Sequence, residues 1–170
     1  MFKKGEYVVY GNLGVCRVND LVTRQFEGLD AAHPYYVLEP VYQDGTLYVP
    51  ADNPKISLRP VISAEEANRL IDAIAATKSK AFHSHSAQEL SAHYEQAMHS
   101  HECKDLIDLT MSIYNKKTAL ASQNKKFGRV DEHFLKQAED TLNGELAVAL
   151  GISREEVPGY IKARIAQAKA

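Results

Sequence analysis

The segment from His83 to Cys103 holds most of the side chains in this sequence that could bind a transition metal. Five of the seven histidines lie in it, and His99, His101 and Cys103 alternate with other residues. Zinc requires three or four ligands that converge on one point. Hydrophobic residues here have helical spacing, and helical residues two apart point to different faces. We therefore predict a solvated helix surface and no metal or other cofactor, with a metal-dependent or metal-sensing protein as the more distant alternative.

Sequence arrangements that support catalysis are not found. The chain has no Walker-type phosphate loop, no GxGxxG motif and no Gly-x-Ser-x-Gly turn for a serine nucleophile. Cys16 lies within an apolar run, which is typical of a buried thiol. The acidic pairs at residues 65–66 and 155–156 stand at expected helix starts, where the helix dipole favours negative charge. We therefore do not predict an enzyme.

Basic residues are concentrated between residues 113 and 130, in a stretch without any acidic side chain. Such a cluster can neutralise phosphates and bind nucleic acid without reading its sequence. A solvated basic loop explains the charges equally well. The residues of this basic cluster are Lys116, Lys117, Lys125, Lys126 and Arg129.

The first part of the chain has the pattern of a small β-module. Short β-branched and aromatic runs lie at residues 7–10, 15–18, 35–38 and 46–49, each bounded by Gly, Pro, Asn or Asp. An Asp-Gly pair before the fourth run predicts a hairpin turn. The pattern predicts a strongly bent sheet of four or five strands, in the manner of an SH3-like or Tudor-like barrel.

After residue 60 the pattern becomes helical. Ser-x-x-Glu sequences at residues 63–66, 86–89 and 153–156 are capping boxes that mark helix starts. Apolar residues spaced three and four apart predict five helices, the first ending near residue 77. The sequence therefore predicts an α+β protein with two domains. Residues 1–60 form the small β-barrel and residues 61–170 form an all-α helical bundle.

The composition agrees with an ordinary globular protein. Its 170 residues are 45% hydrophobic and 25% charged. Two distant cysteines indicate a reducing cytoplasm, and no apolar run approaches the roughly 18 residues that span a bilayer. Because the net charge is −2, nucleic-acid binding would have to come from a local patch.

Motifs in both parts of the chain resemble one known family. The first part contains Phe2-Lys3-x-Gly5-x-x-Val8-Val9-Tyr10, then Tyr36-x-Leu38, then Tyr48-Val49-Pro50-x-Asp52-Asn53. The second part contains Ile113-Tyr114-x-Lys116-Lys117, then Asp131-x-x-Phe134-Leu135, then Glu145-Leu146-Ala147. Together they resemble the CarD/CdnL family of transcriptional regulators. The first domain of that family is similar to the RNA-polymerase-interacting domain of transcription-repair coupling factors.

The resemblance implies a bacterial regulator of transcription. Its Tudor-like domain would dock on the β1 lobe of the RNA polymerase β subunit, partly by strand pairing. Its helical domain would contact promoter DNA near the upstream edge of the melted bubble. Together they would stabilise the open promoter complex, including at rRNA promoters. We expect a cytoplasmic, nucleoid-associated monomer without membrane contact; an adaptor that binds polymerase or another protein without significant DNA contact is the alternative.

The resemblance also implies site residues. Arg24 matches an arginine that the family uses against polymerase, and Leu47, Tyr48 and Val49 form the accompanying strand. Tyr48 stands where some relatives carry a second arginine, so that contact is changed in kind. Some relatives wedge a tryptophan into the minor groove, but this chain has none. Phe82 is the nearest candidate for that wedge, with packing between helices as its alternative role. The basic cluster completes the predicted DNA-binding set.

Overall fold

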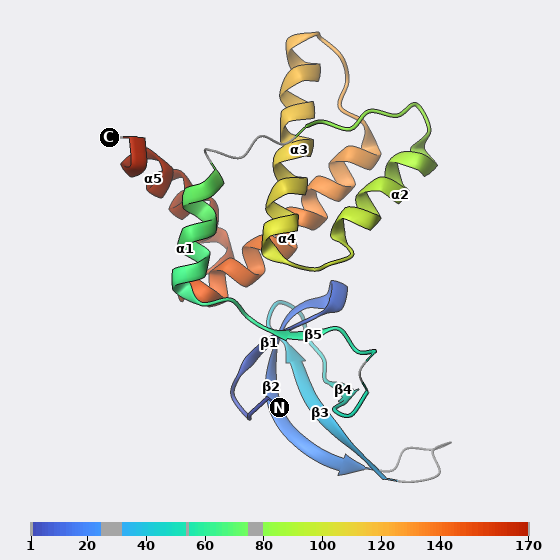
Figure 1. Cartoon of the computed structure of the whole chain (residues 1–170), viewed down its shortest axis with the longest axis vertical. Coiled ribbons are helices and arrows are strands. Elements are labelled where there is room, and N and C mark those ends of the chain that lie inside the picture. Colours follow the sequence, from blue (N-terminus) through green and yellow to red (C-terminus); the bar gives the residue numbers. More distant parts are fainter. Residues whose placement is uncertain (1, 25–31, 54, 75–79, 170) are drawn as a thin grey trace. The chain divides into compact units, whose positions relative to one another are not determined.

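The computed structural model of this protein describes residues 2–24, 32–53, 55–74 and 80–169. The chain divides into two compact units, Met1–Ser63 and Ala64–Ala170. The strands lie in the first, here called the sheet unit, and the α-helices lie in the second, the helical unit (Figure 1). The two-part α+β architecture predicted from the sequence is therefore confirmed.

Five antiparallel strands form the sheet in the order β4-β3-β2-β1-β5. Among the described residues, the end strands β4 and β5 do not pair with each other, so closure into a barrel stays a prediction. The strands are β1 (Tyr7–Tyr10), β2 (Gly14–Arg24), β3 (His33–Pro40), β4 (Leu47–Pro50) and β5 (Leu58–Pro60).

The core of the sheet unit lies on one face of the sheet, because side chains in a strand alternate between two faces. Phe2 packs edge-on against Tyr36, with ring centroids 5.8 Å apart. Burial raises the pKa of the Cys16 thiol to about 11, so this cysteine is the buried side chain that the sequence predicts. The buried cluster consists of Val8, Cys16, Val18, Tyr36, Leu38 and Val49.

The helical unit is built around its longest helix, α4, which contacts all four other helices. Gly151 ends α4 with a φ of 70°, the left-handed conformation that glycine adopts readily. The predicted end of the first helix, near residue 77, lies outside the described residues. None of the described helices is long and apolar enough to cross a membrane. The helices are α1 (Ala64–Ala73), α2 (Ala87–Met98), α3 (Cys103–Ser122), α4 (Arg129–Leu150) and α5 (Val157–Lys169).

Two of the predicted capping boxes can be compared with the structure. The Ser153 box is complete: its hydroxyl accepts from the Glu156 amide, and the Glu156 carboxylate accepts from the Ser153 amide. At the start of α2 the Ser86 hydroxyl accepts from the Glu89 amide, but the Glu89 carboxylate accepts from the Ser84 hydroxyl instead. The Ser153 capping box is therefore confirmed and opens a 3-10 turn, Arg154–Glu156, that leads into α5, whereas only the N-cap half of the Ser86 box is formed.

An ion pair joins α1 to α5. Arg164 donates through Nε and Nη2 to the two carboxylate oxygens of Asp72, at 2.7 and 2.9 Å. These hydrogen bonds hold the pKa of the Asp72 carboxyl below its ordinary value of 3.8. A carboxyl whose pKa is lower in the folded protein stabilises it above the unfolded pKa, and this contribution is lost as the pH falls through the lowered value.

Asp72→Asn is therefore expected to lower the melting temperature at pH 7 by about 2 °C, a small change because the pair is exposed. Thermal melts of both proteins, followed by circular dichroism from pH 7 to pH 3, measure the difference. It should shrink as the pH falls below 3.8. A difference that stays constant across this range would contradict the assigned role of the ion pair.

Candidate functional site

The predicted polymerase-contacting strand lies at one end of the sheet. Among the described strands, β4 pairs only with β3, through register partners such as Val37 and Tyr48 (Figure 1). The opposite edge of β4 therefore lies outside the described strand ladder. Edges of this kind can pair with an extended segment of another protein.

The three predicted polymerase-contacting residues of β4 differ in how far their side chains are exposed. Tyr48 is 40% exposed, whereas the Val49 side chain is 2% exposed and belongs to the core. Leu47 packs against the same core cluster and is half-buried. Side chains alternate along a strand, so Tyr48 points to the face opposite Leu47 and Val49. Tyr48 can thus offer its side chain to a partner. Val49 can offer neither its side chain nor its backbone, because its backbone groups have the same parity as those of Ala51, which donates to the carbonyl oxygen of Pro34 in β3, and so they also point toward β3.

The structure brings Arg24 and Tyr48 together across β3. The Arg24 guanidinium carbon lies 5.2 Å from the centroid of the Tyr48 ring, within the range of a cation–π contact. Arg24 is the register partner of His33 at the end of β3. His33 Nδ1 in turn lies 3.5 Å from Asp52 Oδ2. The sequence did not indicate this role of His33, because only the strand register places it beside Arg24.

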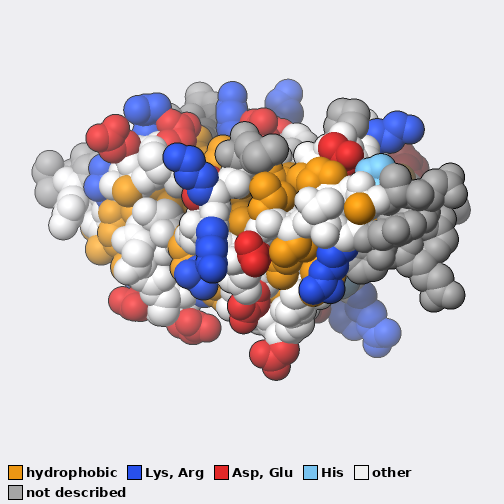
Figure 2. Space-filling model, turned by 90° about the horizontal axis from the view of Figure 1, so that it is seen from below, with side chains coloured by type: hydrophobic (Ala, Val, Ile, Leu, Met, Phe, Trp, Pro, Cys, Tyr) orange, Lys and Arg blue, Asp and Glu red, His pale blue; other side chains and the backbone are white. Residues whose placement is uncertain are grey.

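The surface of the sheet unit mixes several kinds of side chain. The face of the molecule in Figure 2 shows hydrophobic side chains exposed among both basic and acidic ones. A continuous positive patch, which is typical of nucleic-acid-binding surfaces, is not visible on this face. Apolar side chains rimmed by charges of both signs are typical of protein interfaces. The exposed large hydrophobic residues of this unit are Tyr7, Leu21, Val41, Tyr42 and Tyr48.

Lys116 does not belong to the exposed part of the basic cluster. Its ammonium lies 2.9 Å from Asp131 Oδ1, and both side chains are almost fully buried. The Tyr94 hydroxyl donates to the same oxygen at 2.5 Å. Burial and this hydrogen bond raise the pKa of the Tyr94 hydroxyl. The three residues form a buried polar triad that joins α2, α3 and α4, so Lys116 neutralises a carboxylate inside the protein.

The other cations of the cluster are exposed: Lys117, Lys125, Lys126 and Arg129. Lys117 Nζ lies 5.6 Å from the centroid of the Phe127 ring. Of the described residues, none forms an ion pair with Lys125, Lys126 or Arg129. These side chains are therefore available to an anionic partner.

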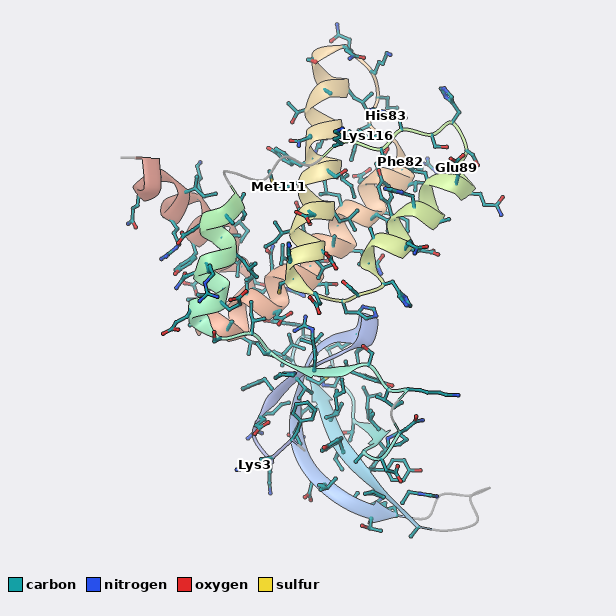
Figure 3. All side chains as sticks on the ribbon, viewed as in Figure 1. Lys3, Phe82, His83, Glu89, Met111 and Lys116 are labelled. Carbon is teal, nitrogen blue, oxygen red and sulfur yellow. The ribbon has the colours of Figure 1, made fainter. Side chains whose placement is uncertain are left out.

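The Phe82 ring is already stacked against a neighbour. It lies parallel to the His93 ring, with centroids 3.7 Å apart and 8° between the planes. Phe82 is half-buried and belongs to the segment that precedes α2 (Figure 3). Insertion of Phe82 into a base step would require it to leave His93, so its position agrees better with the alternative of packing between elements.

A cleft of about 510 Å³ opens between the segment before α2, the end of α3 and the start of α4. It gathers residues from both histidine-rich and basic parts of the sequence. Four cations and one carboxylate line it, which gives +3 with neutral histidines. Its polar lining includes His83, His85, Lys116, Lys125, Lys126, Arg129 and Asp131, and its apolar lining includes Leu90, Leu120 and Val130.

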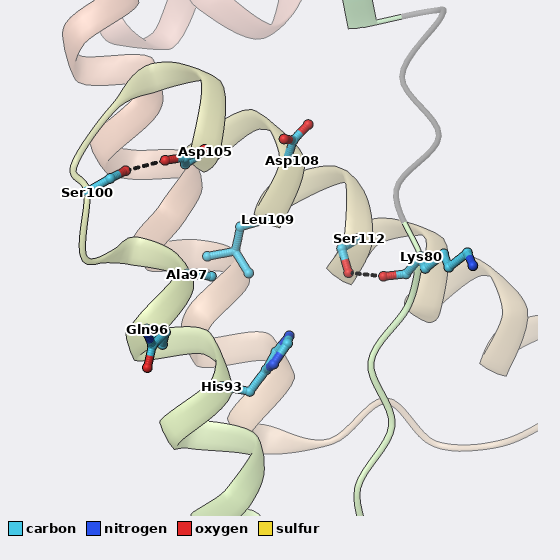
Figure 4. A pocket seen from close by; sticks show the side chains of 9 residues that line it. All are labelled: Lys80, His93, Gln96, Ala97, Ser100, Asp105, Asp108, Leu109 and Ser112. Atoms are coloured by element: carbon cyan, nitrogen blue, oxygen red, sulfur yellow. Dashed lines mark hydrogen bonds between the residues drawn. The ribbon is translucent and has the colours of Figure 1, made fainter.

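A second hollow, of about 500 Å³, lies between α2, α3 and the segment at Lys80 (Figure 4). The Ser112 hydroxyl donates to the Lys80 carbonyl at 2.6 Å, and the Ser100 hydroxyl donates to the Asp105 carboxylate. His93 and Asp108 also line this hollow. Within the part of the chain that the structure describes, no group of three or more His, Cys, Asp or Glu side chains is arranged to hold a metal ion.

The sheet unit matches a known family. Residues 2–62 match the family model of the CarD-like/TRCF RID domain, a span that includes all five described strands. No curated protein matches the chain. RID stands for RNA-polymerase-interacting domain, so the match indicates RNA polymerase as a partner. Residues 2–62 of this chain are therefore similar to the CarD-like/TRCF RID domain, and the resemblance predicted from the motifs of this part is confirmed.

Proposed function

We propose that this protein is a bacterial transcription regulator, cytoplasmic and nucleoid-associated, that stabilises the open promoter complex, including at rRNA promoters. The sheet unit binds the β1 lobe of the RNA polymerase β subunit through the edge of β4, with Arg24 and Tyr48 beside it. The helical unit contacts promoter DNA near the upstream edge of the bubble. The observation that supports this proposal most directly is the family match of residues 2–62.

Each unit has a separate task in this proposal. Docking of the sheet unit raises the effective concentration of the helical unit beside the promoter, so weak phosphate contacts suffice. The exposed cations of the basic cluster supply those contacts, and Lys116 is left out of them because it pairs with Asp131. Such a protein catalyses no reaction. It shifts the equilibrium of promoter opening by binding one state more tightly than the other.

The second candidate is an adaptor that binds polymerase without significant DNA contact. Two observations favour it. Lys116 of the basic cluster is buried in an ion pair, and Phe82 is stacked against His93, so neither side chain is available for the predicted DNA contact. The two candidates share the polymerase contact and differ only in the role of the exposed cations.

Replacement of Lys117, Lys125 and Lys126 by alanine tests the DNA contact. We expect the open-complex half-life at an rRNA promoter to fall by about three- to tenfold, with a weaker salt dependence, because up to three phosphate contacts are removed. Binding to the isolated β1 lobe in a pull-down should not change. A matched control replaces three exposed lysines elsewhere in the helical unit: Lys104, Lys136 and Lys162.

An unchanged half-life, with lobe binding intact, would select the adaptor. Failure of the wild-type protein to bind the isolated lobe would reject the polymerase contact as proposed.

A further inference from the structure

The cleft between α2, α3 and α4 has a rim and a floor of different chemistry. Lys125, Lys126 and Arg129 are exposed cations at its border, and none pairs with a described carboxylate. Leu90, by contrast, is 6% exposed. Leu120 and Val130 are half-buried and also line the cleft. A ligand that fits both parts carries negative charge at one end and an apolar body at the other.

The charge of the lining favours an anion. Asp131, the one carboxylate among the described residues that line the cleft, already accepts from Lys116 and Tyr94, so it does not neutralise the exposed cations. The amino end of α4 also borders the cleft at Gly128, its N-cap residue, whose position has no side-chain cap. Anions are favoured near a helix N-terminus. A phosphate group therefore matches the rim.

The floor and the histidines favour a flat ring system. Base–aromatic and base–apolar contacts are the usual way in which proteins hold an unpaired base, and they tolerate any sequence. His83 and His85 border the cleft with rings that can stack or hydrogen-bond. The volume, about 510 Å³, lies within the range of pockets that hold small ligands. An inorganic anion would use the rim and leave the apolar floor empty.

We propose that this cleft binds a single nucleotide, with its phosphate on Lys125, Lys126 and Arg129 and its base over the apolar floor. Its two possible sources are an unpaired nucleotide of a melted strand and a free nucleotide. The inference rests on the proposed DNA contact and deepens it: the helical unit would hold an unpaired base as well as duplex phosphates.

Binding is tested with the full chain by NMR titration and fluorescence anisotropy. The probes are a deoxynucleoside monophosphate, a short single-stranded oligonucleotide, a duplex of the same sequence and inorganic phosphate. We expect the monophosphate or the single strand to shift amide signals at residues 83–90 and 125–131. Binding of the monophosphate identifies a free nucleotide as a possible source, and binding of the strand alone identifies melted DNA. Inorganic phosphate binding as tightly as both would overturn the role of the floor.

Ala87→Trp supplies the matched variant, because Ala87 is an exposed residue of α2 that lines the cleft. The larger side chain should reduce nucleotide and single-strand binding at least fivefold and change duplex binding less than twofold. Ala163→Trp, at an exposed position on α5, is the control. Thermal melts show whether each variant folds, and the wild-type titration decides the question if Ala87→Trp does not fold.

The outcomes separate this inference from the proposed function. Duplex binding without signal shifts at the cleft by nucleotide or single strand would overturn the inference and leave the DNA contact in place. Absence of binding to every nucleic acid probe would overturn the inference alone, because the proposed DNA contact forms on docked polymerase and is tested by the open-complex half-life.

Discussion

Asp131→Ala is expected to lower the free energy of unfolding of this protein by about 3–5 kcal/mol. The substitution removes the carboxylate that accepts from both Lys116 and Tyr94. Lys116 is only 5% exposed, so its ammonium would lose its ion-pair partner without gaining the solvation of bulk water. The Tyr94 hydroxyl, also buried, would lose its acceptor at the same time. Urea denaturation followed by circular dichroism measures the loss.

Two further variants show that the loss comes from the uncompensated charge. Asp140→Ala removes an exposed carboxylate from the same helix, where it pairs with Lys136 at 3.3 Å, and should cost no more than about 0.5 kcal/mol. Adding Lys116→Met to Asp131→Ala removes the orphaned ammonium and should recover part of the stability. If Asp131→Ala and Asp140→Ala destabilise equally, the buried triad does not have the structural role assigned to it.

Arg24→Glu is expected to weaken binding to the β1 lobe at least tenfold. The substitution reverses the charge of a side chain that contacts Tyr48 of β4, and charge reversal at an interface places like charges opposite each other. It also removes the cation that lies 5.2 Å above the Tyr48 ring. Biolayer interferometry with the isolated lobe measures the affinity, and circular dichroism checks that the variant is folded.

Arg17→Glu is the matched control, because Arg17 is exposed on the same strand but lies toward its other end, with Tyr7 and Glu39 as register partners. It should leave the affinity within about twofold. Tyr48→Phe keeps the ring under the guanidinium and should bind nearly as well as the wild type, whereas Tyr48→Ala should lose several-fold. Equal losses from Arg24→Glu and Arg17→Glu would mean that only net charge matters and that the contact does not lie at Arg24.

Local sequence determined the elements of this protein. Short β-branched runs ended by Gly or Pro became strands, and the Ser-x-x-Glu sequence at residues 153–156 became the capping box of a helix start. These features follow from hydrogen bonds and steric limits between residues close in the chain. The division into sheet and helices, and the family of residues 2–62, could therefore be predicted without a structure.

Tertiary packing decided which of the candidate site residues face solvent. Lys116 shares a helix face with the buried Ile113, three residues earlier, and that spacing was the signal that it points inward. Its partner Asp131 lies fifteen residues away, in a different helix. A local sequence pattern cannot predict such a pair, because its two residues are remote in the chain. A buried charge is stable only when the fold places its counter-charge within ion-pair distance.

The same reason explains both candidate surfaces. From the amino-acid sequence alone one can predict a β-module with an arginine and a tyrosine, followed by a helical module with a run of cations. Only the strand register placed Arg24 over Tyr48, and only the packing of the helices brought His83, His85, Lys125 and Lys126 to the lining of one cleft. Residue types and local propensities can be read from the sequence. The distances between side chains remote in the chain are fixed by the burial of apolar faces against one another.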